Sequence, residues 1–138
     1  MPNSVLIKAI LQSYIDTFNK GDAQAVAALF ADDATVEDPV GSLVKQGREE
    51  LLAFYKNAIA TGAKLTLDAP IRASHGEAGA MAFTAQIGQL KVRVIDVMTI
   101  NDAGKITSMK AYFGPDDIIQ PIKDSHGEAD ARAFIAQI

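Results

Sequence analysis

The chain has no cysteine, no tryptophan and only two histidines. The absence of cysteine excludes disulfide bonds and catalysis by a thiol. The two histidines, His75 and His126, have no metal-ligand spacing with each other or with acidic residues, so the sequence indicates no metal site.

No part of the chain gathers basic residues, and no hydrophobic run is long enough to span a membrane. The 17 acidic residues exceed the 13 basic ones and give a net charge of -4, with the lysines and arginines scattered. This pattern argues against nucleic acid and anionic membranes as partners. We recognise no secretion signal before Ile10, because Lys8 interrupts the apolar run, and we therefore expect a cytoplasmic protein.

Hydrophobic residues make up 49% of the 138 residues, enough for one domain with a substantial core. Apolar residues recur every three or four positions over residues 5–19 and about 48–60, which predicts two amphipathic helices. Asp22 can cap a short helix between them, which ends before a turn at Asp32 and Asp33. Strands are predicted at residues 35–38, 64–68, 71–75, 78–87, 90–100 and 105–113. Helices followed by an antiparallel meander predict an α+β domain.

Asp96 stands in the middle of a run, residues 92–100, that otherwise reads as a buried strand. Because side chains alternate along a strand, Asp96 shares its face with Val94 and Met98. Burial on an apolar face raises the pKa of a carboxyl and keeps it protonated unless a cation meets it. A neutral carboxylic acid can donate a hydrogen bond. The alternative interpretation is a core aspartate that is satisfied or paired with Lys or Arg.

Large apolar side chains fall on the corresponding face of three successive predicted strands. They are Met81, Phe83, Met98, Met109 and Phe113. Such a stripe is more often core than ligand site, but the acids among these residues favour a hollow that binds an apolar ligand.

Two further polar residues share a face with apolar neighbours. Asp38 alternates with Val36 and precedes Pro39, so it is either an acid beside aliphatic side chains or a turn-forming aspartate. Tyr14 lies on the buried stripe of the first helix, where its hydroxyl needs a partner, and the alternative there is a core tyrosine bonded to a backbone carbonyl.

Together these residues fall in segments that match a known family, at residues 31–41, 54–55, 94–98 and 109–113. From about residue 5 to 114 the chain resembles the Δ5-3-ketosteroid isomerases of the nuclear transport factor 2-like (scytalone dehydratase-like) superfamily. The resemblance implies a conical α+β domain, in which a curved, mostly antiparallel sheet and about three N-terminal helices enclose an apolar cavity. It places this domain at residues 1–114 and leaves a C-terminal extension, residues 115–138, whose end could form a short helix.

The resemblance also implies roles for four residues. Asp38 corresponds to the general base, Tyr14 and Asp96 to the donors that stabilise an oxyanion, and Tyr55 to the tyrosine that orients Tyr14. Ketosteroid isomerase is itself a standard example of two aspartates whose pKa values are pushed apart by their surroundings. One branch of the family has a further tyrosine where this chain has Phe30, so the shorter network of Tyr14 and Tyr55 is expected.

The function implied is an isomerase that moves the double bond of a 3-oxo-Δ5 steroid to the conjugated Δ4 position through a dienolate. No cofactor is required, the large apolar side chains would line the steroid site, and the family is usually homodimeric. Two alternatives stay open. One is another enzyme of the same cone, such as a cyclase or dehydratase of a polyketide-like substrate. The other is a non-catalytic domain that binds an apolar ligand or a protein partner.

Overall fold

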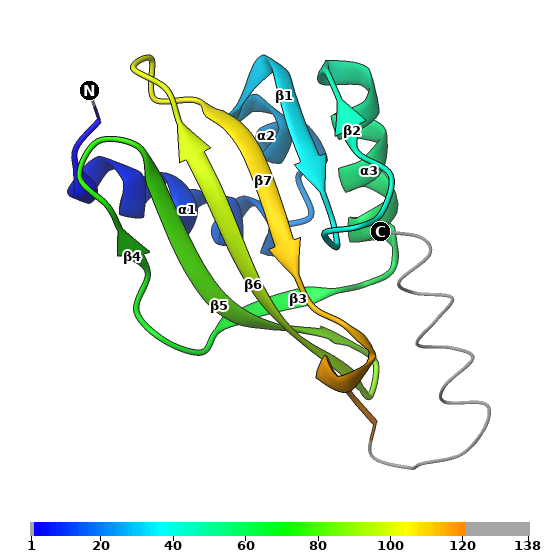
Figure 1. Cartoon of the computed structure of the whole chain (residues 1–138). Helices are drawn as coiled ribbons and strands as arrows, with labels where there is room; N and C mark the ends of the chain where they lie inside the picture. Colours follow the sequence, from blue (N-terminus) through cyan, green and yellow to red (C-terminus); the bar gives the residue numbers. More distant parts are fainter. Residues whose placement is uncertain (1, 121–138) are drawn as a thin grey trace.

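The computed structural model describes residues 2–120, in which three helices lie together on one face of a curved sheet (Figure 1). The helices are α1 (Ser4–Asn19), α2 (Ala23–Ala28) and α3 (Arg48–Ala60). The predicted α+β class is confirmed. The short helix expected near the C-terminus and His126 lie outside the described residues. Within residues 2–120, no helix combines the length and the apolar character that crossing a bilayer would require.

Side-chain caps fix where the first two helices begin. The Asn3 carboxamide accepts a hydrogen bond from the Leu6 amide at 2.8 Å, and the Asp22 carboxylate accepts one from the Ala25 amide at 3.0 Å. One stripe of α1 is buried against the sheet, as its period predicted. It consists of Ile7, Ile10, Leu11, Tyr14, Ile15 and Phe18. This stripe carries Tyr14 into the interior.

The sheet has the strand order β2-β1-β7-β6-β5-β3, with β4 added on β5 and β8 on β6. Its strands are β1 (Phe30–Glu37), β2 (Lys45–Gln46), β3 (Lys64–Leu67), β4 (Arg72–Ala73), β5 (Ala78–Ile87), β6 (Leu90–Ile100), β7 (Ile106–Tyr112) and β8 (Ile118–Ile119). All pairs are antiparallel except β1 with β7, which run parallel. Figure 1 shows β5 and β6 as long strands that bend along the sheet.

The turn expected at Asp32 and Asp33 is wrong, because both residues belong to β1. Both are exposed, and the pairing of β1 with β7 shifts register between Phe30 and Thr35. Two successive exposed residues and a register shift are typical of a bulge. In a regular strand the side chains of Asp32 and Asp33 would point to opposite faces. A bulge at this point allows both charges to be exposed.

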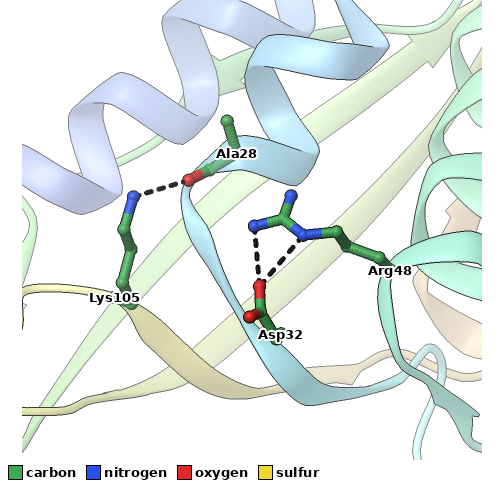
Figure 2. A network of polar contacts seen from close by, with 4 residues as sticks. All are labelled: Ala28, Asp32, Arg48 and Lys105. Carbon is green, nitrogen blue, oxygen red and sulfur yellow. Dashed lines mark hydrogen bonds and ion pairs between the residues drawn. The ribbon is translucent and has the colours of Figure 1, made fainter.

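Polar contacts link β1 to α3 and the end of α2 to the residue before β7, as Figure 2 shows. The Arg48 guanidinium donates to Asp32 Oδ1 through Nε at 3.0 Å and Nη2 at 2.8 Å, and Lys105 Nζ donates to the Ala28 carbonyl at 2.9 Å. These groups are exposed, so the ion pair contributes at most ~1 kcal/mol to stability. Its effect is to fix the start of α3 relative to β1.

The register of the central strands places Asp96 among apolar residues. Asp96 lies opposite Met81 on β5 and Ala111 on β7, and Met98 lies opposite Met109. Directly paired residues project from the same face of a sheet. The common face that alternation predicted for these strands is therefore confirmed.

The sheet continues past residue 114, where we expected the domain to end. A 3₁₀ turn, η1 (Pro115–Asp117), leads into β8, which pairs with Lys91 and Val92 of β6. Ile118 is partly buried against the core, which accounts for this continuation. The boundary at residue 114 followed from the extent of the family resemblance.

Gly79 on β5 marks a close approach of the sheet to α1. A Cβ added there would lie 2.7 Å from Ile7 Cγ2 and 3.1 Å from Leu11 Cδ2. We expect Gly79→Ala to lower the free energy of unfolding by about 1–3 kcal/mol, the usual cost of overpacking. Denaturant unfolding measures this, with Gly114→Ala as the control, because a Cβ at Gly114 meets nothing within 4 Å. Equal stability of the two variants would contradict the close packing.

Candidate active site

A pocket lies between the helices α1 and α3 and the sheet. Its lining is apolar apart from two tyrosines and one aspartate. The lining residues are Tyr14, Phe18, Asp38, Phe54, Tyr55, Ala58, Ala63, Leu65, Phe83, Ala85, Val92, Val94 and Phe113. It encloses about 480 Å³ of empty space when its open mouth is included. An apolar pocket with a few convergent polar groups is the usual form of a small-molecule site.

The two tyrosines form a buried pair deep in this pocket. Tyr14 comes from α1 and Tyr55 from α3, and the Tyr14 hydroxyl donates to the Tyr55 hydroxyl at 3.1 Å. Their rings meet edge to face with centroids 5.7 Å apart, and Phe30 packs against both. Burial raises the pKa of Tyr14 and of Tyr55 well above the usual value, so both hydroxyls keep their protons.

Asp96 is 1% exposed, and neither carboxyl oxygen has a hydrogen-bond partner within residues 2–120. Burial, followed by the charge of Asp38, raises the pKa of Asp96 well above its usual value. No lysine or arginine of the described chain neutralises it, so the interpretation as an ion-paired core aspartate does not hold there. A raised pKa favours the protonated form, which has a proton to donate.

Asp38 follows the last residue of β1 and is half-buried, with Oδ1 enclosed and unpartnered among the described residues. Burial raises the pKa of Asp38 and the positive charge of Lys45 offsets part of this rise, so that the pKa is about 7. Asp38 therefore ionises close to neutral pH, whereas the surroundings of Asp96 favour its protonated form. The two aspartates differ because Asp96 is more deeply enclosed and faces no cation.

The structure places only some of the expected ligand-contacting residues on the pocket. Phe83 and Phe113 line it. Met81, Met98 and Met109 are at most 2% exposed, do not line it, and pack on the sheet face around Asp96.

Sequence reasoning missed several wall residues, most of them small or aliphatic, and it missed Lys45. Phe18 could have been found, because it lies one helical turn after Tyr14 on the same buried stripe. Phe54 precedes Tyr55 in a matched segment but was assigned no role. No sequence pattern singles out Lys45. Residues 2–120 contain no group of three or more acids or histidines that could hold a metal ion.

Comparison with known proteins agrees with this geometry. The model of the SnoaL-like domain matches residues 11–109. The steroid Delta-isomerase of Nocardioides simplex is 41% identical over 122 residues, which cover 84% of this chain and 96% of that protein. The chain belongs to the SnoaL-like family. Its similarity to a steroid isomerase over nearly the whole of that enzyme supports isomerase activity.

This SnoaL-like chain is also similar to an epoxide hydrolase and to an epoxide hydrolase/cyclase-like enzyme. The epoxide hydrolase LasB of Streptomyces lasalocidi is 26% identical over 125 residues, which span 85% of this chain but 44% of that protein. The solved structure of SalBIII, an epoxide hydrolase/cyclase-like enzyme with a role in pyran ring formation in the polyether salinomycin, has a TM-score of 0.77. It is 28% identical, and the match covers 82% of this chain and 94% of SalBIII. The TM-score shows that SalBIII has the same α+β fold as this chain.

The buried carboxyl of Asp96 makes the stability of this SnoaL-like domain depend on pH. Above about pH 4 the unfolded chain loses the proton of residue 96 while the folded chain keeps it, so folding becomes less favourable as pH rises toward the raised pKa. Asp96→Asn removes this dependence. We expect the difference in Tm, Asp96→Asn minus parent, to be larger at pH 8 than at pH 4 by about 4 °C or more. Calorimetry at both pH values tests this, and a constant difference would mean that Asp96 folds as an anion.

Proposed function

We propose that this protein is a steroid Δ-isomerase that moves the double bond of a 3-oxo-Δ5 steroid into conjugation with the ketone. The observation that carries the proposal is an apolar pocket lined by Asp38 and a hydrogen-bonded tyrosine pair, with Asp96 enclosed behind its lining as a second buried carboxyl of raised pKa. The 41% identity to a steroid Delta-isomerase supports the substrate class. A flat apolar pocket discriminates weakly among ring substituents, so we expect several 3-keto steroids to be accepted.

In this mechanism Asp38 performs both proton transfers. As a carboxylate it takes a proton from the carbon between the ketone and the double bond, and the electron pair of that C–H bond moves into a dienolate. The resulting Asp38 carboxylic acid then returns the proton to the carbon two positions away. The double bond is now conjugated with the ketone, and Asp38 is again an anion. A base whose pKa is about 7 suits this cycle near neutral pH.

Tyr14 and Asp96 would stabilise the negative charge that builds on the ketone oxygen. Both are protonated and buried, where donors aimed at developing charge have their largest effect. A hydroxyl both donates and accepts, so Tyr55, 3.1 Å from Tyr14, can donate to the Tyr14 oxygen once Tyr14 donates to the dienolate. Tyr55 is therefore proposed as the residue that orients Tyr14.

A second candidate function is opening of an epoxide, favoured by the similarity to LasB and SalBIII. A protonated Asp96 could donate to the epoxide oxygen while Asp38 activates the attacking hydroxyl or water. We prefer the isomerase because the match to the steroid isomerase has higher identity and covers 96% of that enzyme, against 44% of LasB.

Ultraviolet absorbance separates these functions. Purified protein mixed with a Δ5-3-keto steroid should produce the absorption band of the conjugated enone, at a rate proportional to protein concentration. In a parallel incubation with the protein, an epoxide-bearing substrate should remain unchanged. No enone band with several 3-keto steroids would remove the isomerase proposal, and turnover of the epoxide alone would favour the second candidate.

We also propose a homodimer that forms through the outer face of the sheet. Ile95 and Tyr112 are cross-strand partners on the face opposite Asp96, and they are 50% and 47% exposed. With Val40 they line a shallow hollow on that face. Equilibrium sedimentation should give twice the chain mass for the parent and the chain mass for Tyr112→Lys. A monomeric parent would contradict the proposal.

A further inference from the structure

The side chain of Lys45 projects from the face of the sheet on which the Asp38 carboxyl lies. It belongs to the two-residue strand β2 and pairs antiparallel with Val36 of β1. Opposed residues in an antiparallel pair project to the same face, and so do residues two apart along a strand. Val36 is fully buried and precedes Asp38 by two positions. The fold therefore directs Lys45 toward the Asp38 side of the pocket.

Two contacts hold the Lys45 ammonium at the rim. Lys45 Nζ donates to the Leu43 carbonyl at 3.1 Å and lies 5.4 Å from the ring centroid of Phe54. Phe54 lines the pocket together with Asp38. A cation over an aromatic ring is attracted by the negative charge of the ring face. Because Lys45 is half-buried, its charge is screened less than that of a free surface lysine.

The ammonium acts on Asp38 without bonding to it. Asp38 Oδ1 has no hydrogen-bond partner within residues 2–120, and Lys45 is instead bonded to Leu43. A direct ion pair would occupy the carboxylate oxygens that must meet a substrate proton. A cation that acts on the carboxylate without bonding to it favours the anion and leaves those oxygens free.

The other charged and titratable groups around Asp38 are of a different kind. Tyr14, Tyr55 and Asp96 face it from α1, α3 and β6, and burial raises the pKa of each, which favours the neutral form. Glu37 points to the other side and accepts a hydrogen bond from the Gly41 amide at 2.9 Å. Lys110 on β7 is the register partner of Glu37 in the strand pairing, and its side chain is exposed. Within the described chain, Lys45 is the cation whose charge opposes the effect of burial on Asp38.

We propose that Lys45 is a positioning residue, which holds a cation at the pocket rim and thereby keeps the Asp38 carboxyl ionised and ready to accept the substrate proton. This inference rests on the proposed isomerase function, in which Asp38 is the base. It gives the short strand β2 a role in that function, because β2 carries the cation to the rim.

The test compares Lys45→Met and Lys45→Arg with a control, Lys56→Met, which removes the same charge from an exposed position on α3. The acid limb of kcat/KM against pH, and a carbon-13 titration of Asp38, should both move to higher pH by about 0.5–1 in Lys45→Met. At pH 6 its kcat/KM should fall roughly threefold to tenfold, with near-parental values on the plateau at higher pH. Lys45→Arg and Lys56→Met should keep the parental midpoint.

An unchanged midpoint in Lys45→Met would overturn the inference. So would a loss of activity by the same factor at every pH, since that would indicate a structural role. If the parent does not isomerise steroids, the proposed function fails, but the carbon-13 titration still reports whether Lys45 controls the ionisation of Asp38. The two failures are therefore distinguishable.

Discussion

Asp38→Asn is expected to lower kcat by about 10²–10⁴-fold or more, because an amide of nearly the same shape cannot accept the substrate proton. Binding of a phenol that resembles the dienolate should survive, since that affinity depends on Tyr14, Asp96 and the apolar walls. Steady-state kinetics by enone absorbance and titration with the phenol measure the two effects separately.

The control for this change is Glu37→Gln. It removes the same charge at the neighbouring position, where Glu37 binds the Gly41 amide outside the pocket and an amide oxygen can replace it. We expect its turnover to stay within about threefold of the parent. If Asp38→Asn lost phenol binding and turnover by the same factor, Asp38 would be structural and the assignment of the base would be wrong.

Asp96→Leu is expected to lower kcat by about 10²–10³-fold, the usual cost of removing one oxyanion donor. Asp96→Asn keeps an N–H donor at the same place and should be milder. Leucine suits the apolar surroundings of Met81 and Ala111, so the Leu variant should fold at least as stably as the parent. Kinetics with one steroid, combined with thermal unfolding, separate lost catalysis from lost structure.

Met98→Leu gives a matched control, because Met98 is fully buried on the same face of β6 two positions away. This volume-conserving change should alter kcat by less than about threefold. If Asp96→Leu were faster than Asp96→Asn, a protonated donor at residue 96 would not be part of the mechanism.

The sequence predicted the central strands well because β5 and β6 alternate without interruption. That alternation alone places Asp96 on a buried face, and the structure confirms it. The prediction of a turn at Asp32 and Asp33 was wrong, because two charges in a row are typical of a turn but here occupy a bulged part of β1. The sequence also gave no sign that β1 runs parallel to β7, since that pairing joins residues far apart in the chain.

The site was less predictable than the fold. Alternation assigns Met98 and Phe83 to corresponding faces but does not say which of them meets a ligand, because that depends on where α1 and α3 cover the sheet. Tyr14 and Asp38 had satisfactory structural interpretations on their own, and only the family resemblance brought them together. Lys45 affects Asp38 through the pairing of a two-residue strand, which no hydrophobic period can indicate.

Carbon-13 NMR of the side-chain carboxyls of the aspartates, with Asp96→Asn and Asp38→Asn used for assignment, tests the central claim most directly. The account predicts that residue 96 gives the signal of a protonated carboxyl at pH 7 and begins to titrate only above neutrality, while residue 38 has a midpoint near 7. A residue 96 that is already deprotonated at pH 7 would contradict it.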